Sequence, residues 1–192
     1  MNTILNGKHL ILGSKSPRRS FLLESLDLIF EVRNIEVEEI YDKNLSPSEV
    51  VEYLAKLKTT AYSQTLKENE IVVCSDTVVV FQNKIIGKPK DIEHAKDIIS
   101  DLSDNSHFVY TGVCIKSIEK EIVFHDISEV ELMPLNQNEI NYYVDKYKPL
   151  DKAGAYGIQE WIGYSKIKSI KGSYSNIMGL PVHKVYEYLK TF

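Results

Sequence analysis

Short apolar runs alternate along the chain with segments of helical periodicity. Residues 9–14 form an apolar run that ends in a Gly-Ser pair, which predicts a short buried strand. Pro17 then suits the first turn of a helix that runs through Leu26. A second strand is expected at residues 30–33. The order of strand, polar loop, helix and strand is typical of α/β proteins.

The clearest helix signal follows an acidic segment. Ser46 and Glu49 have the spacing of a capping box, and Pro47 stands at the first helical position. Apolar residues then recur at helical spacing. This pattern predicts a long helix that ends at about Leu66.

Residues 71–81 are nearly continuous Val, Ile and Phe, which predicts a strand buried on both faces. Asp76 interrupts this run. An ionised carboxylate there costs several kcal/mol unless a cation or hydrogen-bond donors satisfy it. We therefore expect Asp76 to face a cleft, where a divalent ion or a water to be deprotonated is its natural partner. The alternative is a structural aspartate that is hydrogen-bonded at a strand bulge.

The rest of the pattern predicts a hairpin between helices. The expected elements are a helix at 91–102 with Asp91 as its N-cap, antiparallel strands at 108–118 and 121–133, a helix at 136–147, a loop-rich segment at 151–175 and a closing helix at 181–189. No repeat, low-complexity tract or linker interrupts the chain. We expect one domain over residues 1–192, of the α/β class with a mixed sheet.

Composition and charge narrow the class of protein. The chain has 192 residues, 43% of them hydrophobic and 26% charged, which fits a soluble globular protein and excludes a disordered or collagen-like one. The net charge of -4 argues against non-specific binding to a nucleic acid duplex. No apolar run approaches the roughly 18 residues that span a membrane. We expect a cytoplasmic protein of enzyme size.

The sequence lacks the motifs of several common metal sites and enzyme classes. Cys74 and Cys114 lie in apolar runs, so we expect buried thiols; two cysteines do not make a structural zinc site alone. The five histidines form no metal-binding pair. A Gly-x-Ser-x-Gly elbow and a Rossmann Gly-x-Gly-x-x-Gly are both absent from the sequence. Serine hydrolases and dinucleotide-binding enzymes are therefore disfavoured.

The loop between the first strand and the first helix combines several groups that bind phosphate in proteins. Hydroxyls, backbone N–H groups and the guanidinium groups of Arg18 and Arg19 converge at a helix N-terminus. The spacing is not that of a Walker loop. In isolation, such arginines beside a proline turn are more often solvated charges.

Other candidates are weak one by one. Lys58 lies on the flank of the long helix, and Lys88 lies in a stiff Gly-Lys-Pro loop; either lysine alone is more often a surface charge. The glycine-punctuated segments 151–159 and 172–181 are consistent with simple turns. The first of them carries Gln159, a planar amide.

Taken together, these segments resemble the Maf family, the septum-formation-type nucleoside triphosphate pyrophosphatases. The motifs occur in the family's order over essentially the whole chain: LILGSKSPRR, VEE, SDTVV, GKPKD, HFVYTGV, LDKAGAYGIQ and GSYSNIMGLP. The resemblance implies an elongated mixed sheet flanked by helices, with two lobes around a central cleft, related to inosine triphosphate pyrophosphatases. Many members of the family are homodimers, so a second copy of the chain is one implied partner.

Within the family, SDT followed by AYGIQ resembles the branch that hydrolyses dTTP and UTP to the nucleoside monophosphate and pyrophosphate. By that resemblance Asp76 is the proton acceptor. Substrate specificity would lie with Arg18, Thr77 and Gln159. Phosphate binding would involve Ser14, Ser16, Arg18, Arg19, Lys58 and Lys88, a divalent Mg²⁺ or Mn²⁺ ion would be held partly by Glu39 and Asp76, and Asp91 matches a further residue that the family uses around the metal and triphosphate.

Gln159 has a chemical reason to select uracil or thymine, because its amide accepts from N3–H and donates to O4 at the same time. Cytosine has the reverse pattern, with an acceptor at N3 and a donor at its 4-amino group. Since the amide can flip, Gln159 alone would discriminate incompletely.

The sequence departs from the family pattern in three places. Gly13 replaces the usual alanine, a change expected to matter little because glycine permits the same turn. Asp104 replaces a glycine, which puts the conformation of its loop in question. Trp161 replaces a small residue and would narrow or extend the base pocket.

Two other functions remain open on the sequence. One is a nucleotide-binding regulator of cell division that senses a nucleotide without hydrolysing it. The other is a sibling pyrophosphatase for modified or purine nucleotides. For a dTTP/UTP pyrophosphatase, the physiological role stays open between removal of non-canonical nucleotides before incorporation and control of the nucleotide pool. The presence of a carboxylate beside lysines and arginines favours an enzyme, because a sensor needs no carboxylate next to a triphosphate.

Overall fold

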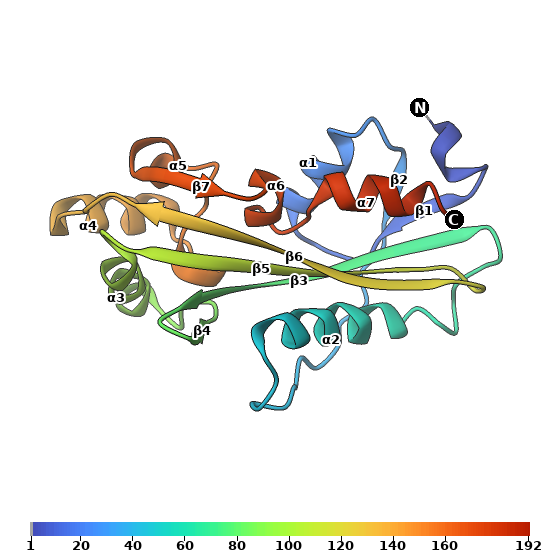
Figure 1. Ribbon diagram of the computed structural model, residues 1–192, viewed down its shortest axis with the longest axis horizontal. Coiled ribbons are helices and arrows are strands. Elements are labelled where there is room, and N and C mark those ends of the chain that lie inside the picture. The colour runs from blue at the N-terminus through green and yellow to red at the C-terminus, as the bar shows by residue number, and fades with distance from the viewer. Residues whose placement is uncertain (1) are drawn as a thin grey trace. The chain divides into compact units, whose positions relative to one another are not determined.

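The structure is a computed structural model that describes residues 2–192. Its centre is a mixed seven-stranded sheet with the strand order β2-β1-β3-β5-β6-β7, in which β4 pairs with β3 beside this path (Figure 1). The strands are β1 (His9–Leu12), β2 (Phe30–Val32), β3 (Glu70–Phe81), β4 (Lys84–Ile86), β5 (Ser106–Lys116), β6 (Glu121–Leu132) and β7 (Ile167–Lys171). The expected α/β class with a mixed sheet is confirmed.

The chain forms two compact units. The first contains the residues up to Asp76, Thr111–Asp126 and Gly179–Phe192, and the second contains Thr77–Tyr110 and Ile127–Met178. The helices of the first unit are η1 (Asn2–Leu5), α1 (Pro17–Glu24), α2 (Pro47–Thr60) and α7 (Val182–Leu189). The helices of the second unit are α3 (Ile92–Leu102), α4 (Gln137–Tyr147), η2 (Ala153–Ala155), α5 (Trp161–Ser165) and α6 (Tyr174–Ile177).

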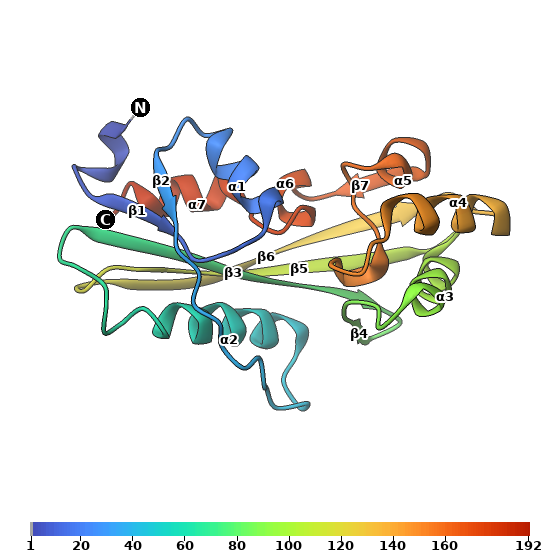
Figure 2. The same cartoon turned by 180° about the vertical axis from the view of Figure 1, so that it is seen from behind.

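In the first unit, β1 lies between β2 and the first part of β3 and is parallel to both. Helix α2 covers one face of these strands, and α1 and α7 lie on the other (Figures 1 and 2). A run of three leucine and isoleucine side chains in β1 is completely buried, as its apolar sequence predicts: Leu10, Ile11 and Leu12. The sheet is therefore covered on both faces here, which explains the continuous apolar sequence of β1 and β3.

The close packing of α2 on β5 depends on a glycine. A Cβ atom at Gly112 would lie 2.2 Å from the carbonyl oxygen of Val51. No side chain fits at that distance, so glycine lets the helix backbone approach the strand directly. Leu54 and Ala55 of α2 are buried in the same layer.

The capping box of α2 is confirmed, but its predicted end at Leu66 is wrong. Ser46 Oγ accepts from Glu49 N–H, and the Glu49 side chain accepts from Ser46 N–H. The helix ends at Thr60 and passes into turns. There, Tyr62 is buried, and its hydroxyl donates to Arg33 O and accepts from Ile35 N–H. Because the buried Tyr62 side chain bonds to the backbone of residues 33 and 35, the chain leaves the helix before Leu66, which is also buried.

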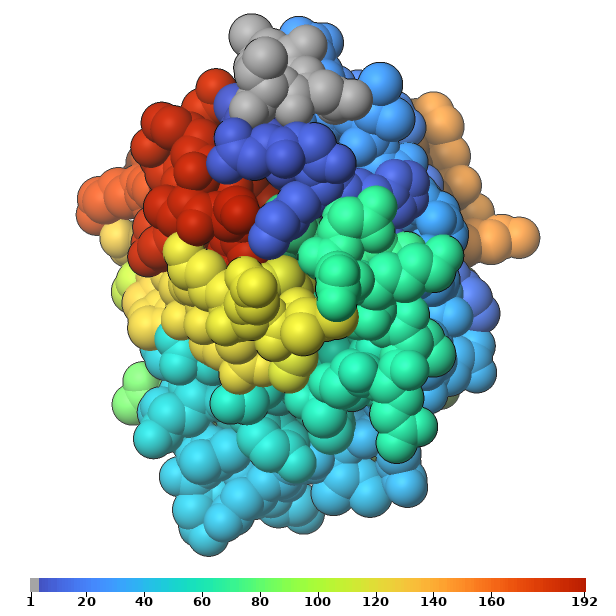
Figure 3. All heavy atoms as spheres, turned by 90° about the vertical axis from the view of Figure 1, so that its right-hand side faces the viewer, coloured from blue at the N-terminus to red at the C-terminus, as the bar shows by residue number. Residues whose placement is uncertain are grey.

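Helix α7 packs on the part of β6 that belongs to the first unit. The rings of Phe124 and Tyr188 lie 4.5 Å apart, and Lys184 Nζ lies 2.6 Å from Asp126 Oδ1. Figure 3 shows the β5–β6 turn beside the C-terminal segment, where Lys120 Nζ donates to Thr191 O at 2.6 Å. The predicted hairpin and the closing helix are thus confirmed.

In the second unit, Val79, Val109 and Val130 form a core across three neighbouring strands. Gly154 adjoins it with a φ of +71°, and a Cβ atom there would lie 2.8 Å from Val79 Cγ2. Helix α3 packs against α4 and η2. Asp91 caps α3 as predicted, since its Oδ1 accepts from His94 N–H at 2.8 Å.

The segment at 151–175, predicted to be loop-rich with short strands, also contains the short helices α5 and α6. Helices of four or five residues are not stable by themselves, so sequence periodicity does not reveal them. Tertiary contacts hold α6: Asn176 Nδ2 donates to Val109 O at 3.1 Å and to Ser128 Oγ at 2.9 Å. None of the helices in residues 2–192 is long and apolar enough to cross a membrane.

Candidate active site

A buried carboxylate and a lysine form the centre of the candidate site in the first unit. Asp76 lies in the buried middle of β3, and its side chain is 12% exposed. Lys58, in the last turn of α2, places Nζ 2.5 Å from Asp76 Oδ1. The same Nζ lies 2.9 Å from Glu39 Oε1. The cation that the sequence demanded for Asp76 is therefore supplied by α2.

These residues fit a divalent ion that is shared with a substrate. Two carboxylates, Glu39 and Asp76, reach the same ammonium group, so their oxygens lie near one point. Mg²⁺ typically binds through one or two carboxylates together with substrate phosphates. Within residues 2–192 there is no cluster of three or more His, Cys, Asp or Glu side chains that would hold a metal by themselves. The donor set suits Mg²⁺ or Mn²⁺ only if a phosphate completes the coordination.

The loop before α1 is held in shape by its own side chains. Ser14 is buried, and its Oγ accepts from Ser16 N–H at 3.1 Å and from Arg19 Nη1 at 3.3 Å. Ser16 is the N-cap residue of α1, and its side chain makes no capping hydrogen bond. Arg18 is half-buried in the first turn of α1. The loop thus keeps two hydroxyls and two guanidinium groups at a helix N-terminus, where anions are stabilised.

Charge links this loop to the buried carboxylate. Burial lowers the pKa of Arg19, the negative charge of Asp76 raises it in part, and the neighbouring Arg18 lowers it. An arginine remains a cation under all these influences. The sequence-predicted residues Arg19, Lys58 and Asp76 therefore belong to one electrostatic cluster.

Sequence reasoning missed the part that Gly179 plays in this cluster. The Gly179 carbonyl accepts from Arg19 Nε at 2.9 Å and from Ser75 Oγ at 3.1 Å. Gly179 has a φ of +102°, a conformation that favours glycine. The sequence of segment 172–181 is consistent with a simple turn, and only the glycine before Leu-Pro indicated a backbone conformation with positive φ. Through this carbonyl, the end of the chain fixes the orientation of an arginine in α1.

Four further predicted residues belong to the second unit. Thr77 follows Asp76 directly in β3, Lys88 is exposed in the loop after β4, and Asp91 is the N-cap of α3. Gln159 is half-buried, and its Oε1 is buried without a hydrogen bond in the described part of the chain. An amide oxygen in that state is available to a ligand.

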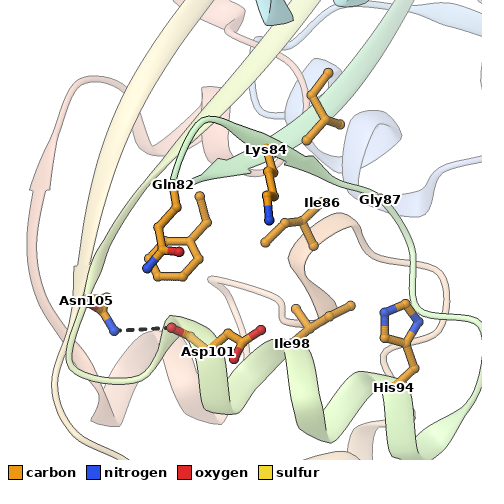
Figure 4. Close-up of a pocket in the computed structure, with 10 residues that line it drawn as sticks. Gln82, Lys84, Ile86, Gly87, His94, Ile98, Asp101 and Asn105 are labelled. Carbon is orange, nitrogen blue, oxygen red and sulfur yellow. Dashed lines mark hydrogen bonds between the residues drawn. The ribbon is translucent and has the colours of Figure 1, made fainter. Parts of the chain in front are cut away.

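The second unit also contains a pocket of about 430 Å³ between the β3–β4 turn and α3. Figure 4 shows Lys84 pointing from β4 toward α3, which carries His94, Ile98 and Asp101. None of the site residues predicted from the sequence lines this pocket.

The two cysteines are free and buried, as predicted. Burial raises the pKa of Cys74 to about 11 and that of Cys114 to about 12. Both thiols therefore stay protonated at neutral pH and contribute no nucleophile.

Comparison with known proteins now identifies the family. The family model described as Maf-like protein matches residues 9–192. The chain belongs to the Maf family. The resemblance that the ordered motifs indicated is thereby confirmed.

Individual Maf proteins align with nearly the whole chain. A protein of Flavobacterium johnsoniae named dTTP/UTP pyrophosphatase is 50% identical over 95% of this chain and 94% of its own length. One of Bacteroides thetaiotaomicron with the same name is 45% identical over 97% of each chain. The structure titled "The structure of the Staphylococcus aureus Ham1 protein" matches 65% of this chain and 72% of that one, with a TM-score of 0.45 and 17% identity.

The structure describes two departures from the Maf sequence pattern. Asp104, in place of glycine, has a φ of +57°, a conformation that aspartate tolerates better than most residues. Gly13, in place of alanine, was expected to matter little because glycine permits the same turn, and this stays a prediction. A Cβ atom at Gly13 would lie 2.4 Å from Cys74 Sγ and 3.0 Å from Tyr62 Oη, so an alanine here would require these side chains to shift.

The third departure concerns the end of the AYGIQ motif. Trp161 packs edge-on against Tyr142 of α4, with ring centroids 5.4 Å apart. The indole is thus held against a helix of the same unit. The role in the base pocket that was expected for it stays a prediction.

Proposed function

We propose that this Maf protein hydrolyses dTTP and UTP between the α- and β-phosphates, which gives the nucleoside monophosphate and pyrophosphate. The observation that carries the proposal is the buried pair of Asp76 and Lys58, linked to Arg19 by charge. Relatives named dTTP/UTP pyrophosphatase at 50% and 45% identity support it. A buried carboxylate beside a lysine and an arginine suits the attack of water on a polyphosphate.

Cationic side chains would lower the repulsion between the triphosphate and an incoming nucleophile. Arg18 and Arg19 lie at the N-terminus of α1, where the helix dipole adds to their charge. Lys58 and the exposed Lys88 would contact the remaining phosphates. Ser14 and Ser16 would shape the loop, because Ser14 Oγ already accepts from two groups within it.

Asp76 would orient the attacking water and take its proton as the oxygen bonds to the α-phosphorus. Lys58 donates a hydrogen bond to this carboxylate and holds it in place before the reaction. The bond from the α-phosphorus to the bridging oxygen then breaks, and pyrophosphate leaves with the electron pair. Glu39 would hold the divalent ion, and Asp76 would be its second ligand only where it is not the base, because one carboxylate cannot easily fill both roles. When bound, the ion would stabilise the charge on the leaving group.

Gln159 would select the base. Its Oε1, which has no hydrogen bond within residues 2–192, would accept from N3–H of uracil or thymine, and its Nε2 would donate to O4. Cytosine presents an unprotonated N3 to the same acceptor. Arg18 and Thr77 would complete the set of specificity residues.

The test is product analysis after incubation of the pure protein with each common nucleoside triphosphate and Mg²⁺ or Mn²⁺. We expect the monophosphate and pyrophosphate from dTTP and UTP. In ¹⁸O-labelled water the label should appear in the monophosphate, because water attacks the α-phosphorus. Label in pyrophosphate would place the attack on the β-phosphorus, and diphosphate with phosphate would refute the proposed bond.

The same assay separates the two alternative functions. Preferred turnover of purine or modified nucleotides would indicate a sibling pyrophosphatase. Tight binding without turnover, over all nucleotides and both metals, would indicate a nucleotide-sensing regulator.

We further propose that the protein acts in the cytoplasm on free nucleotides, as a homodimer and without a nucleic acid partner. The net charge of -4 supports the last point, because duplex binding requires a basic surface. Light scattering measures the mass of the assembly, and a mass near 22 kDa would refute the dimer.

A further inference from the structure

The second unit contains a buried polar cluster that the proposed chemistry does not use. Tyr143 of α4 is fully buried, and its hydroxyl donates to Glu160 Oε2. The same hydroxyl accepts from Gly157 N–H at 2.9 Å. Glu160 Oε1 in turn lies 3.1 Å from Nζ of Lys152, whose side chain is 10% exposed. Burial and the carboxylate of Glu160 raise the pKa of Tyr143, so the phenol keeps its proton and remains a donor.

This cluster holds the backbone on both sides of Gln159. The Tyr143 hydroxyl bonds to Gly157 and Glu160, and Glu160 N–H donates to Gly157 O at 3.0 Å to close a turn around Gln159. The turn has no spare room, since a Cβ atom at Gly157 would lie 2.7 Å from Glu160 Cδ. Tyr143 therefore determines where the Gln159 amide is presented.

A second contact fixes the residue before this turn. The Tyr156 hydroxyl lies 2.8 Å from Nε2 of His107, a fully buried residue at the start of β5. Their rings meet edge to face, with centroids 5.5 Å apart. Burial lowers the pKa of His107 to about 4, so the imidazole is neutral at physiological pH. The turn is thus anchored from β5 as well as from α4.

The backbone of this turn is held by hydrogen bonds, but the side-chain oxygen of Gln159 makes none within residues 2–192. The backbone around it is held at three residues, while its Oε1 is buried and makes no hydrogen bond to any of residues 2–192. A buried acceptor without a partner costs free energy, and that cost persists only if the surrounding structure imposes it. The anchored turn imposes it here.

We propose that Tyr143 is a positioning residue for base selection, which acts through Gln159 by fixing the turn that carries the amide. This proposal rests on the proposed role of Gln159 in selecting uracil and thymine. Tyr143 contacts the turn and has no assigned contact with substrate, so it is not a catalytic residue. Its removal should alter the choice between bases and leave the chemical step in place.

The test compares two neighbouring tyrosines of α4. Tyr143→Phe keeps the buried ring, which stacks on Tyr147, and deletes only the hydroxyl. Tyr142→Phe is the matched control, because Tyr142 is 46% exposed and its hydroxyl accepts from Lys146 on the surface. The readout is the ratio of kcat/KM for UTP to that for CTP.

We expect Tyr143→Phe to lower this ratio about fivefold to tenfold, the effect of one hydrogen bond lost between the displaced Gln159 amide and the base. The loss should appear as a higher KM for UTP with kcat within about twofold, because a binding contact is lost and not a transition-state contact. The ratio should be unchanged in Tyr142→Phe. Equal losses of kcat for UTP and CTP would show a general structural role and overturn the proposal.

A double variant tests whether Tyr143 acts through Gln159. In a Gln159→Ala background, Tyr143→Phe should cause no further loss of selectivity, because the amide that it positions is gone. A further loss as large as in the wild-type background would overturn the proposal. If Tyr143→Phe does not fold, Glu160→Ala serves in its place: it removes the acceptor of the Tyr143 hydroxyl while Lys152 keeps its ion pair with Asp151, so the ratio should fall, and an unchanged ratio would overturn the proposal.

A binding measurement separates this proposal from the proposed hydrolysis. Dissociation constants of α,β-imido-UTP and α,β-imido-CTP, which cannot be cleaved at the proposed bond, are measured by calorimetry for the same variants. If the wild type prefers the uracil analogue without any turnover of UTP, the proposed hydrolysis fails while the role of Tyr143 is still tested. Equal affinity of the wild type for both analogues would overturn the role of Tyr143.

Discussion

At the scale of single residues, the main feature is the carboxylate of Asp76, whose neighbours along the strand supply no cation to balance its negative charge. Asp76 stands in an apolar strand, and the structure supplies Lys58 at 2.5 Å. The sequence predicted the need for a cation but not its source, because Lys58 lies 18 residues earlier on a different element. The need for a cation beside Asp76 follows from its place in an apolar strand. Which residue supplies that cation depends on how α2 packs on the sheet.

We predict that Asp76→Asn lowers kcat for UTP by about 10²-fold to 10⁴-fold, the usual contribution of a general base. The asparagine keeps the size of the side chain and still accepts from Lys58, so the fold and nucleotide binding should be retained. Steady-state kinetics and calorimetry with α,β-imido-UTP measure the two effects. Asp101→Asn, an exposed change in α3, is the control and should retain wild-type kinetics. Turnover of Asp76→Asn at the wild-type rate would refute the assignment.

His107 makes the stability of the protein depend on pH. Burial lowers its pKa from 6.5 to about 4 in the folded state. Above pH 6.5 the imidazole is neutral in both states; between pH 6.5 and 4 only the unfolded chain takes up the proton, so stability is lost as the pH falls. The expected loss from this residue is about 3 kcal/mol.

Urea unfolding at pH 7 and pH 4.5 measures this loss. His107→Gln should flatten the pH dependence, because the group that titrates is gone. His183→Gln is the control, since the side chain of His183 is 54% exposed. An identical pH dependence in wild type and His107→Gln would contradict the prediction.

At the scale of elements, sequence patterns located most helices and strands but not all of their ends. The start of α2 was predictable because a capping box is a local arrangement of two residues within four consecutive positions. Its end was not, because the burial of Tyr62 involves Arg33 and Ile35, which lie far away in sequence. The same reason applies to α6, which depends on contacts of Asn176 with two strands.

We predict that Ser46→Ala destabilises the protein by about 1 kcal/mol through loss of the N-cap of α2. This corresponds to a fall in Tm of about 2–4 °C. The kcat should be unchanged, because Lys58 lies at the opposite end of the helix. Differential scanning calorimetry measures Tm, with Ser48→Ala, one position inside the helix start, as the control. A fall in kcat without a change in Tm would contradict this account.

At the scale of the whole molecule, the metal ion is expected to serve the reaction and not the fold. In residues 2–192, no cluster of three or more potential ligands would hold an ion by itself. The core instead consists of buried apolar layers on β1 and β3. Structural metal sites supply folding free energy only where the protein contributes most of the ligands.

We therefore predict that chelation with EDTA abolishes turnover of UTP by more than about 10²-fold while Tm changes by less than about 1 °C. Restoring Mg²⁺ or Mn²⁺ in excess should restore the rate. The same protein sample serves for both measurements, and EDTA saturated with Mg²⁺ is the control. A large fall in Tm on chelation would reveal a structural ion and refute the prediction.

The sequence by itself determined the α/β class, the positions of most elements and the membership of the Maf family, because periodicity, caps and ordered motifs are local features of the chain. It also singled out Asp76, since an aspartate in an apolar strand is conspicuous without any structure. Only the tertiary structure decided which cation meets Asp76, which side chains surround Gly13, and which contacts Gly179 and Tyr143 make. Those features join residues that are distant in sequence, and packing alone brings such residues within hydrogen-bond distance.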